Sequence, residues 1–300
     1  MSLEDTSEPM EPDFGGLAYE KQEDGSYKVS IGDEDQNKEE NAQLIQGLKD
    51  QVVELKAELD RMNRAPNRAA GGITSGPTLT GEDGPEAVIP LAKGKSWTYQ
   101  IETVYDDPDG KTVLHTFEMR NLGSAELGDG STAWIRRSNN GHEYWLVSND
   151  QGISRVAMKT PTQEQAVMDI QPRQVLPAKL AVGQTWTYLT APYFLKRRNE
   201  HPAEIHHLNR YKNLPMVFKV AELDVKIQTP AGDFEHCAKV EGVMEILIWN
   251  DHFTSFKPTP IVTREWYCPD VGLVQVERDE PTTAKFFQGG RMRMRLMDYH

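Results

Sequence analysis

Gly94-Lys95-Ser96-Trp97-Thr98-Tyr99 returns 89 residues later as Gly183-Gln184-Thr185-Trp186-Thr187-Tyr188. Downstream, Glu143-Tyr144-Trp145 and a following Gly152 return as Glu265-Trp266-Tyr267 and Gly272, at offsets of about 120 residues. Repetition at fixed landmarks indicates duplicated structural units. We therefore expect two tandem related units, residues 88–170 and 171–300, with the second lengthened by insertions on both sides of Gly232.

The hydrophobic pattern within each unit has a period of two. Trp97, Tyr99 and Ile101 alternate with polar residues, and turn signals such as Asn139-Asn140-Gly141 interrupt the runs at hairpin distances. The pattern predicts a mainly β fold of antiparallel strands. The expected strands lie near 95–105, 112–122, 131–138, 143–148, 153–158, 184–190, 216–228, 234–249, 261–268, 272–279 and 283–297, with helical signal only at 161–169 and 203–211.

Composition excludes several classes of protein. Of the net charge of −13, residues 1–40 carry −10, whereas residues 91–300 hold 26 acidic and 25 basic side chains. Without a basic excess on the body we expect no nucleic-acid partner. No window approaches the roughly 18 apolar residues of a membrane span, so we expect no transmembrane segment.

The N-terminal segment is expected to be a disordered acidic tail over residues 1–37, because it is poor in aliphatic residues. Met1-Ser2-Leu3 before Glu4-Asp5 is typical of an expression leader joined to a trimmed chain, so we expect that a signal peptide or lipid anchor has been removed. A cytosolic protein without such a segment is the alternative.

Residues 38–63 predict a coiled-coil helix, and the Gly- and Pro-rich residues 64–87 predict a flexible linker. The heptad stripe favours self-association as a homo-oligomer, with a dimer preferred to a trimer. The alternative is docking of the helix on the protein's own body. The expected oligomerisation residues are Ile45, Leu48, Val52, Leu55, Leu59 and Met62.

Two sequence motifs resemble those of a known group of proteins. Gly-x-x-Trp-Thr-Tyr, followed by Trp266-Tyr267-Cys268-Pro269-Asp270-Val271-Gly272-Leu273-Val274, is similar to a group of bacterial exported and lipoprotein-anchored β domains of unknown function. The resemblance implies a curved antiparallel sheet like that of the Lol-type lipoprotein carriers. It implies a location in the periplasm or cell envelope and supplies no catalytic motif.

We find no hydrolase, protease or nucleotide-binding motif, and we expect no cofactor and no metal. Glu204 and His207 would share a helix face, but so small a ligand set favours a solvated loop. A hydrolase using Asp233, Glu235 or His236 beside Trp249 remains a minor alternative that lacks a nucleophile.

Cys237 and Cys268 are the only cysteines. A hairpin turning near residues 251–252 would bring them face to face, and a disulfide would indicate an oxidising compartment. Two buried thiols fit the sequence equally well, because pairing cannot be deduced from spacing. Among the six tryptophans, Trp134 and Trp249 have no tryptophan at the matching repeat position, which makes them candidate binding residues.

The second unit contains a basic, His-rich insertion that the first unit lacks. Long loops on a β scaffold often carry binding, and this one suits an acidic partner or a phosphate-bearing ligand. A solvated loop, or one that holds the acidic tail, is the alternative. Its candidate binding residues are Lys196, Arg197, Arg198, His206, His207, Arg210 and Lys212.

Together these features predict a non-enzymatic binding or scaffold module of the bacterial cell envelope, oligomerised through its helix, with an envelope protein as one expected partner. The alternative is a periplasmic carrier that holds a lipid or another apolar ligand in a cavity of the curved sheet. Unfilled apolar volume inside the sheet would favour the carrier.

Overall fold

The computed structural model describes residues 17–21, 27–31, 88–106, 110–128, 130–194, 196–197, 214–250, 255–283 and 287–300. All regular structure in these residues is β, which confirms the predicted class. Two strands lie in the N-terminal segment, β1 (Leu17–Lys21) and β2 (Tyr27–Ile31), and they pair antiparallel. The body contains β3 (Ser96–Tyr105), β4 (Thr112–Glu126), β5 (Thr132–Ser138), β6 (Glu143–Asn149), β7 (Gly152–Lys159), β8 (Val167–Pro177), β9 (Thr185–Thr190), β10 (Lys196–Arg197), β11 (Leu214–Thr229), β12 (Gly232–Asn250), β13 (Ser255–Cys268), β14 (Gly272–Glu280), β15 (Phe287–Gln288) and β16 (Gly290–Tyr299).

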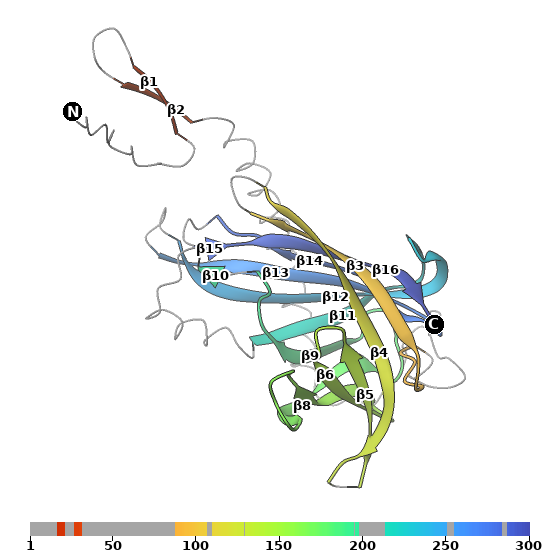
Figure 1. Cartoon of the computed structure of the whole chain (residues 1–300). Helices are drawn as coiled ribbons and strands as arrows, with labels where there is room; N and C mark the ends of the chain where they lie inside the picture. The colour runs from red at the N-terminus through yellow and green to blue at the C-terminus, as the bar shows by residue number, and fades with distance from the viewer. Residues whose placement is uncertain are drawn as a thin grey trace, which may run out of the picture.

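Twelve strands form one antiparallel sheet in the order β8-β7-β6-β5-β4-β3-β16-β14-β13-β12-β11-β9. The sheet curves until its two edge strands, β8 and β9, approach each other, so that it is nearly closed. In Figure 1 the strands β3, β16, β14, β13 and β12 form a long layer, and β5, β6, β8 and β9 lie beneath it. The long strand β4 continues from the layer into the smaller group.

The strand order divides the sheet into two six-stranded meanders. β3 to β8 pair in sequence, and β9, β11, β12, β13, β14 and β16 do the same. The repeated landmarks occupy matching strands: Trp97 and Trp186 lie on the first strand of each meander, and Trp145 and Trp266 lie on the fourth. The expected two units are therefore not separate sheets, because the β16–β3 ladder joins them into one.

The core fills the concave side of the sheet. Alternate residues of β11 to β13, such as Phe218, Val240 and Ile261, are at most 1% exposed and share a cluster with Leu146 and Ile153 of the opposite meander. Gly242 makes this packing possible. A Cβ there would lie 2.6 Å from a ring carbon of Phe218, so only glycine leaves room for the ring. Phe218 in turn stacks on Tyr188, with ring centroids 4.4 Å apart.

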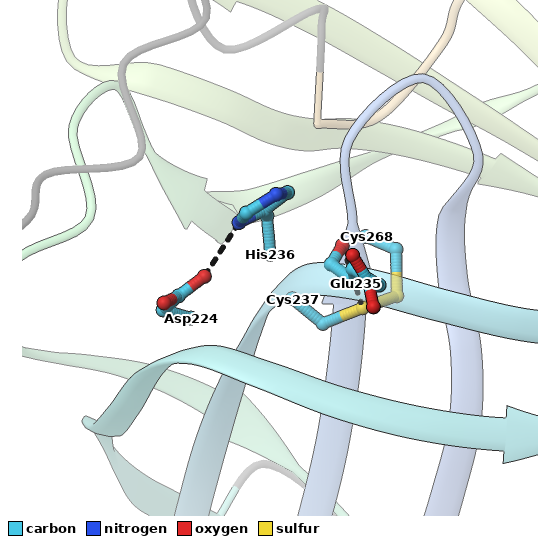
Figure 2. Close-up of a disulfide and its surroundings, with 5 residues drawn as sticks. All are labelled: Asp224, Glu235, His236, Cys237 and Cys268. Carbon is cyan, nitrogen blue, oxygen red and sulfur yellow. Dashed lines mark hydrogen bonds and ion pairs between the residues drawn. A yellow bond between two sulfur atoms is a disulfide. The ribbon is translucent and has the colours of Figure 1, made fainter.

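A disulfide joins Cys237 of β12 to Cys268 of β13, and both residues are buried. The expected hairpin of β12 and β13 places them side by side. Next to the bond, His236 lies 2.5 Å from Asp224, exposed and pointing away from the disulfide (Figure 2). Thirteen residues of one strand separate His236 from Trp249, a distance of roughly 40 Å at strand rise. The predicted grouping of His236 with Trp249 in a hydrolase site is therefore wrong.

Other expectations are corrected or fall outside the described residues. The helical signal at 161–169 is wrong, since residues 161–166 are irregular and β8 begins at Val167. The tail expected to be disordered includes the β1–β2 pair. The predicted coiled-coil helix, the linker and the 203–211 helical signal lie outside the described residues. The described residues contain no helix with the length and apolar character needed to cross a membrane.

Candidate functional site

The junction of β8 with β9 differs from the rest of the sheet, and we name it the seam. Leu176 and Pro177 at the end of β8 are buried, but the earlier part of the strand is exposed. The β7–β8 ladder breaks between Ala157 and Arg155, so that residues 169–172 of β8 bulge out opposite Val156. A bulge leaves the extra residues unpaired and bends its strand. The N-terminal part of β8 is therefore irregular and mostly exposed.

An ion-pair cluster lies at the base of this bulge. Asp169 accepts two hydrogen bonds from Arg155, at 2.8 Å from Nε and 2.9 Å from Nη2, and its Oδ1 atom lies 3.5 Å from Nε of Arg173. The three side chains are only 11–28% exposed. Burial lowers the pKa of Arg173, and the nearby charge of Arg155 lowers it further, whereas Asp169 opposes the change. Arginine stays protonated at neutral pH, so the cluster is a fixed group of charges.

One tyrosine ring, that of Tyr144, lies beside the cluster. The guanidinium carbon of Arg155 lies 6.0 Å from the ring centroid of Tyr144. Burial raises the pKa of Tyr144, so its hydroxyl remains neutral. Tyr193, in the segment that follows β9, stands at the same junction and is 61% exposed. Its ring lies 4.0 Å from the guanidinium carbon of Arg278. A cation over an aromatic face is attracted to the ring and orients it.

A buried ion pair fastens the segment after β9 to the sheet. Arg278 and Glu280 of β14 have side chains that are 3% and 0% exposed, and Nε of Arg278 donates to Glu280 at 2.6 Å. The same carboxylate accepts hydrogen bonds from the backbone N–H of Tyr193 at 2.8 Å and of Phe194 at 2.7 Å. Arg278 also donates to the carbonyl of Ala191. These bonds fix residues 191–194, the start of the basic insertion.

The insertion continues from this anchor into the short strand β10. Lys196 pairs with Gln288, and Arg197 pairs with Phe287 of β15. Of the predicted basic cluster, the structure therefore places the backbone of these two residues beside β15, directly before β16 in the chain. Arg198, His206, His207, Arg210 and Lys212 lie outside the described residues.

The N-terminal part of β8, residues 167–170, has apolar side chains exposed to solvent. Val167 is 56% exposed, Met168 is 58% exposed and Ile170 is 90% exposed. Edge strands of soluble proteins usually carry charged side chains at such places. An exposed apolar group beside a charged one is typical of a contact surface.

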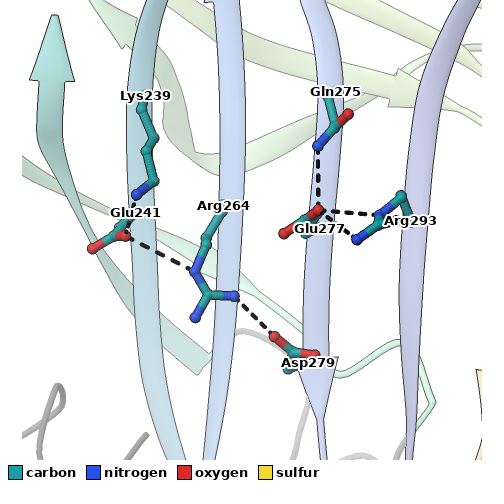
Figure 3. A network of polar contacts seen from close by, with 7 residues as sticks. All are labelled: Lys239, Glu241, Arg264, Gln275, Glu277, Asp279 and Arg293. Atoms are coloured by element: carbon teal, nitrogen blue, oxygen red, sulfur yellow. Dashed lines mark hydrogen bonds and ion pairs between the residues drawn. The ribbon is translucent and has the colours of Figure 1, made fainter. Parts of the chain in front are cut away.

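The outer face of the sheet has the opposite character. Lys239, Glu241, Arg264 and Asp279 form successive ion pairs across β12, β13 and β14, and Arg293 of β16 pairs with Glu277 (Figure 3). Ion pairs near the surface contribute about 0–1 kcal/mol each. The six side chains of these pairs together carry no net charge.

The structure describes the side chain of only one of the two predicted tryptophans. Trp134 on β5 packs against the main core. The side chain of Trp249 lies outside the described residues. The cluster of Arg155, Asp169 and Arg173 was missed by the sequence analysis, because the fold brings together strands whose contact the sequence pattern does not show. Among the described residues, no group of three or more His, Cys, Asp or Glu side chains could hold a metal ion.

Comparisons with known proteins give solved structures of low similarity. The chain is 13% identical to a candidate exported protein with a YmcC-like fold from Bacteroides fragilis, covering 70% of this chain and 96% of that one, with a TM-score of 0.29. A candidate lipoprotein from Parabacteroides distasonis is 14% identical over 70% of this chain and 97% of that one, with a TM-score of 0.29. A LolA superfamily protein from Nitrosomonas europaea is 11% identical over 73% of this chain and 90% of that one, with a TM-score of 0.28. No protein-family model and no curated protein matches the chain.

Proposed function

We propose that this chain is a non-enzymatic binding module of the bacterial cell envelope that takes an anionic partner at its basic insertion. The observation that carries the proposal is the fastening of the basic insertion to the rigid sheet by Arg278 and Glu280. A buried ion pair satisfied by backbone donors positions a loop firmly, and positioned loops on rigid scaffolds carry binding. The insertion contains Lys196, Arg197, Arg198, Arg210 and Lys212 in sequence.

The disulfide supports an exported location. Disulfides persist in oxidising compartments such as the periplasm and are rare in the cytosol. The Cys237–Cys268 bond is consistent with an exported chain, and the sequence motif of the exported β domains points the same way. Lipid anchoring of the N-terminal segment is part of this proposal.

A charge-reversal experiment tests the anionic-partner proposal. The variant Lys196→Glu/Arg197→Glu is compared with Arg291→Glu/Arg293→Glu, which makes the same charge change on exposed residues of β16. Binding of fluorescent poly-L-glutamate is followed by anisotropy, with circular dichroism showing that both variants fold. We expect at least tenfold weaker binding for the insertion variant and little change for the control. Equal binding by the two variants would contradict the proposal.

Self-association through residues 38–63 is a separate proposal that depends on the heptad stripe of the sequence. Native mass spectrometry of the full chain should show a dimer, or a trimer as the second choice. Deletion of residues 38–62 should give a monomer with an intact disulfide. An unchanged oligomer after the deletion would refute the proposal.

We also infer that the two meanders arose by duplication. The supporting observation is that the two halves have the same strand order. Each half has six strands, and the Gly-x-x-Trp-Thr-Tyr motif lies at the first strand of both. The turn before the fifth strand carries a glycine in both halves, Gly152 and Gly272, each with a positive φ. Repetition of a strained backbone position together with strand order favours common descent over chance.

The alternative function is a carrier of an apolar ligand on the concave face. It is favoured by side chains there that remain only partly buried, among them Phe117, Met119, Leu273 and Met292. The fully packed Met216 and Phe218 argue against a wide cavity. Native mass spectrometry after gentle purification distinguishes the two functions, because a lipid-sized adduct would favour the carrier.

A further inference from the structure

A group of polar side chains lies on the concave side of the sheet, and the proposed function does not use it. Tyr144 of β6 lies two residues before Leu146, and Tyr188 of β9 pairs with Met216. Leu146 and Met216 both belong to the main core, so the two tyrosines face the same interior. Arg155 pairs with Leu146 across the β6–β7 ladder and therefore shares this face. Both meanders thus direct polar groups toward one interior region.

Electrostatic contacts show that these groups lie close together. The guanidinium carbon of Arg155 is 6.0 Å from the ring centroid of Tyr144. Burial is the main cause of the lowered pKa of Arg173, and Tyr188 and Tyr193 are near enough to oppose that change. The ion-pair cluster on β7 and β8 therefore faces the tyrosines of β9 and of the segment after it. We name this group the interior cluster; its members are Tyr144, Arg155, Asp169, Arg173, Tyr188 and Tyr193.

The interior cluster contains hydrogen-bond donors that lack acceptors. In the part of the chain that the structure describes, the hydroxyl groups of Tyr144 and Tyr188 form no hydrogen bond with the protein. Burial raises the pKa of both hydroxyls, so they keep their protons at neutral pH. The indole N–H of Trp186, two residues before Tyr188 on the same face of β9, is buried and also has no acceptor. Because buried polar groups are normally paired, these donors indicate a missing acceptor.

The charges of the cluster define the kind of acceptor. Arg155 and Arg173 stand directly opposite each other in the β7–β8 ladder, where like charges repel. One carboxylate, that of Asp169, contacts both guanidinium groups, so the three side chains carry a net charge of about +1. Burial raises the pKa of Glu265, the carboxyl near Tyr188, which disfavours a second negative charge. The cluster therefore suits a ligand with one negative charge and several acceptor oxygens.

We propose that the interior cluster binds a singly charged phosphodiester group. Its single charge matches that of the cluster, and its tetrahedral oxygens can accept from donors on several sides, whereas a carboxylate is planar. The side chain of Arg173 is 28% exposed and Tyr193 is 61% exposed, so solvent and a ligand reach the cluster from their side. This site is separate from the anionic partner proposed for the basic insertion. Its phosphodiester belongs either to a small soluble ester or to the head group of a phospholipid.

Saturation-transfer NMR on the full chain in phosphate-free buffer tests the proposal. The probes are dimethyl phosphate, its uncharged analogue trimethyl phosphate, and dihexanoyl phosphatidylglycerol below its micelle concentration. The test variant is Arg173→Gln/Tyr188→Phe, in which the new ring can still stack on Phe218. The matched control is Arg293→Gln/Tyr299→Phe on β16, where both side chains are exposed. Tyr188→Phe alone is the milder variant, and circular dichroism verifies that each protein folds.

We expect dimethyl phosphate to bind the wild type, at least tenfold more weakly the test variant and equally the control. Tyr188→Phe alone should also weaken binding, and trimethyl phosphate should bind at least tenfold more weakly than dimethyl phosphate. Tighter binding of the lipid than of dimethyl phosphate would support a phospholipid head group, and equal binding would support a soluble ester.

Two results would overturn the phosphodiester proposal. One is the absence of binding by both charged probes, and the other is equal binding by the test and control variants. The variant Lys196→Glu/Arg197→Glu separates this proposal from the proposed function, because it should bind dimethyl phosphate as the wild type does. A loss confined to that variant would place the anion at the basic insertion, which refutes the interior site and leaves the proposed function standing.

Discussion

The substitution Glu280→Gln tests the anchor of residues 191–194 most directly. It keeps the size of the side chain but removes the charge that pairs with Arg278 at 2.6 Å. The remaining guanidinium would be 3% exposed without a carboxylate partner. Removing one partner of a buried pair costs about 3–5 kcal/mol, because the other charge stays uncompensated. For a chain of this size that corresponds to a fall in Tm of roughly 6–20 °C.

The expected loss comes from identifiable bonds. Glu280 accepts from Arg278 and from the backbone N–H groups of Tyr193 and Phe194. An amide oxygen can still accept, but hydrogen bonds to an ionised group contribute about 1.5–3 kcal/mol, against about 1 kcal/mol for neutral pairs. Residues 191–194 should therefore loosen along with the loss of global stability.

Thermal and urea unfolding give the stability change, and hydrogen exchange of residues 191–194 shows whether the segment opens. The double variant Arg278→Met/Glu280→Gln should be less destabilised than Glu280→Gln alone, because it removes the orphaned charge as well. Poly-L-glutamate binding should weaken in the single variant as the insertion loses its fixed position. A single variant within 1 kcal/mol of wild type, or a double variant that is the less stable of the two, would refute the reasoning.

Three further predictions concern the rest of the body. Replacing both Cys237 and Cys268 with alanine should lower the free energy of unfolding by about 4 kcal/mol, because the disulfide closes a loop of 31 residues in the unfolded chain. The loss is measured as a fall in the urea midpoint. An unchanged midpoint after reduction of the wild type would contradict the prediction. Gly242→Ala should cost about 1–3 kcal/mol by overpacking against Phe218, and Phe218→Leu in the same chain should recover part of that loss. Burial raises the pKa of Glu265, and the hydrogen bond from Tyr267 partly opposes this change. The protonated carboxyl therefore favours the folded state below its unfolded pKa of about 4.3, and this contribution is lost as pH rises through the folded pKa. The free energy of unfolding of Glu265→Gln, relative to that of the wild type, should therefore rise from pH 4 to pH 7. A difference between variant and wild type that is the same at both pH values would disprove the assignment.

Local patterns were sufficient to predict most of the sheet. The alternation of Trp97, Tyr99 and Ile101 becomes the buried face of β3, and the expected β12–β13 hairpin forms with its cysteines adjacent. Period-two patterns of this kind hold because one face of each strand is buried against the core. Predicted strand positions therefore agree with the structure where both conditions, regular pairing and one buried face, are met.

The sequence did not predict β8, because this strand has neither regular pairing nor one continuously buried face. Its bulge interrupts the alternation, and Pro172 argues against a strand within a sheet. The pairing of Asp169 with Arg155 joins residues on neighbouring strands across an irregular ladder, which no spacing rule anticipates. The anchor by Glu280 joins residues 86 and 87 positions apart, and such contacts follow only from the complete topology.

The location of the candidate site follows from how the two meanders close. Their two junctions are β16 with β3 and β8 with β9, and equal halves could pair equally at both. β16 has a regular alternation of arginine with buried Met294 and Leu296, and it pairs with β3 from Gly290 to Tyr299. β8 occupies the matching place in its own meander, but it is an edge of the sheet and forms no equivalent ladder with β9 in the described residues. The ion-pair cluster of Arg155, Asp169 and Arg173 and the exposed apolar side chains lie on β7 and β8, at this second junction, whereas the described part of the basic insertion pairs with β15. The β16–β3 ladder already joins the two meanders, so the sheet does not depend on a second ladder between β8 and β9.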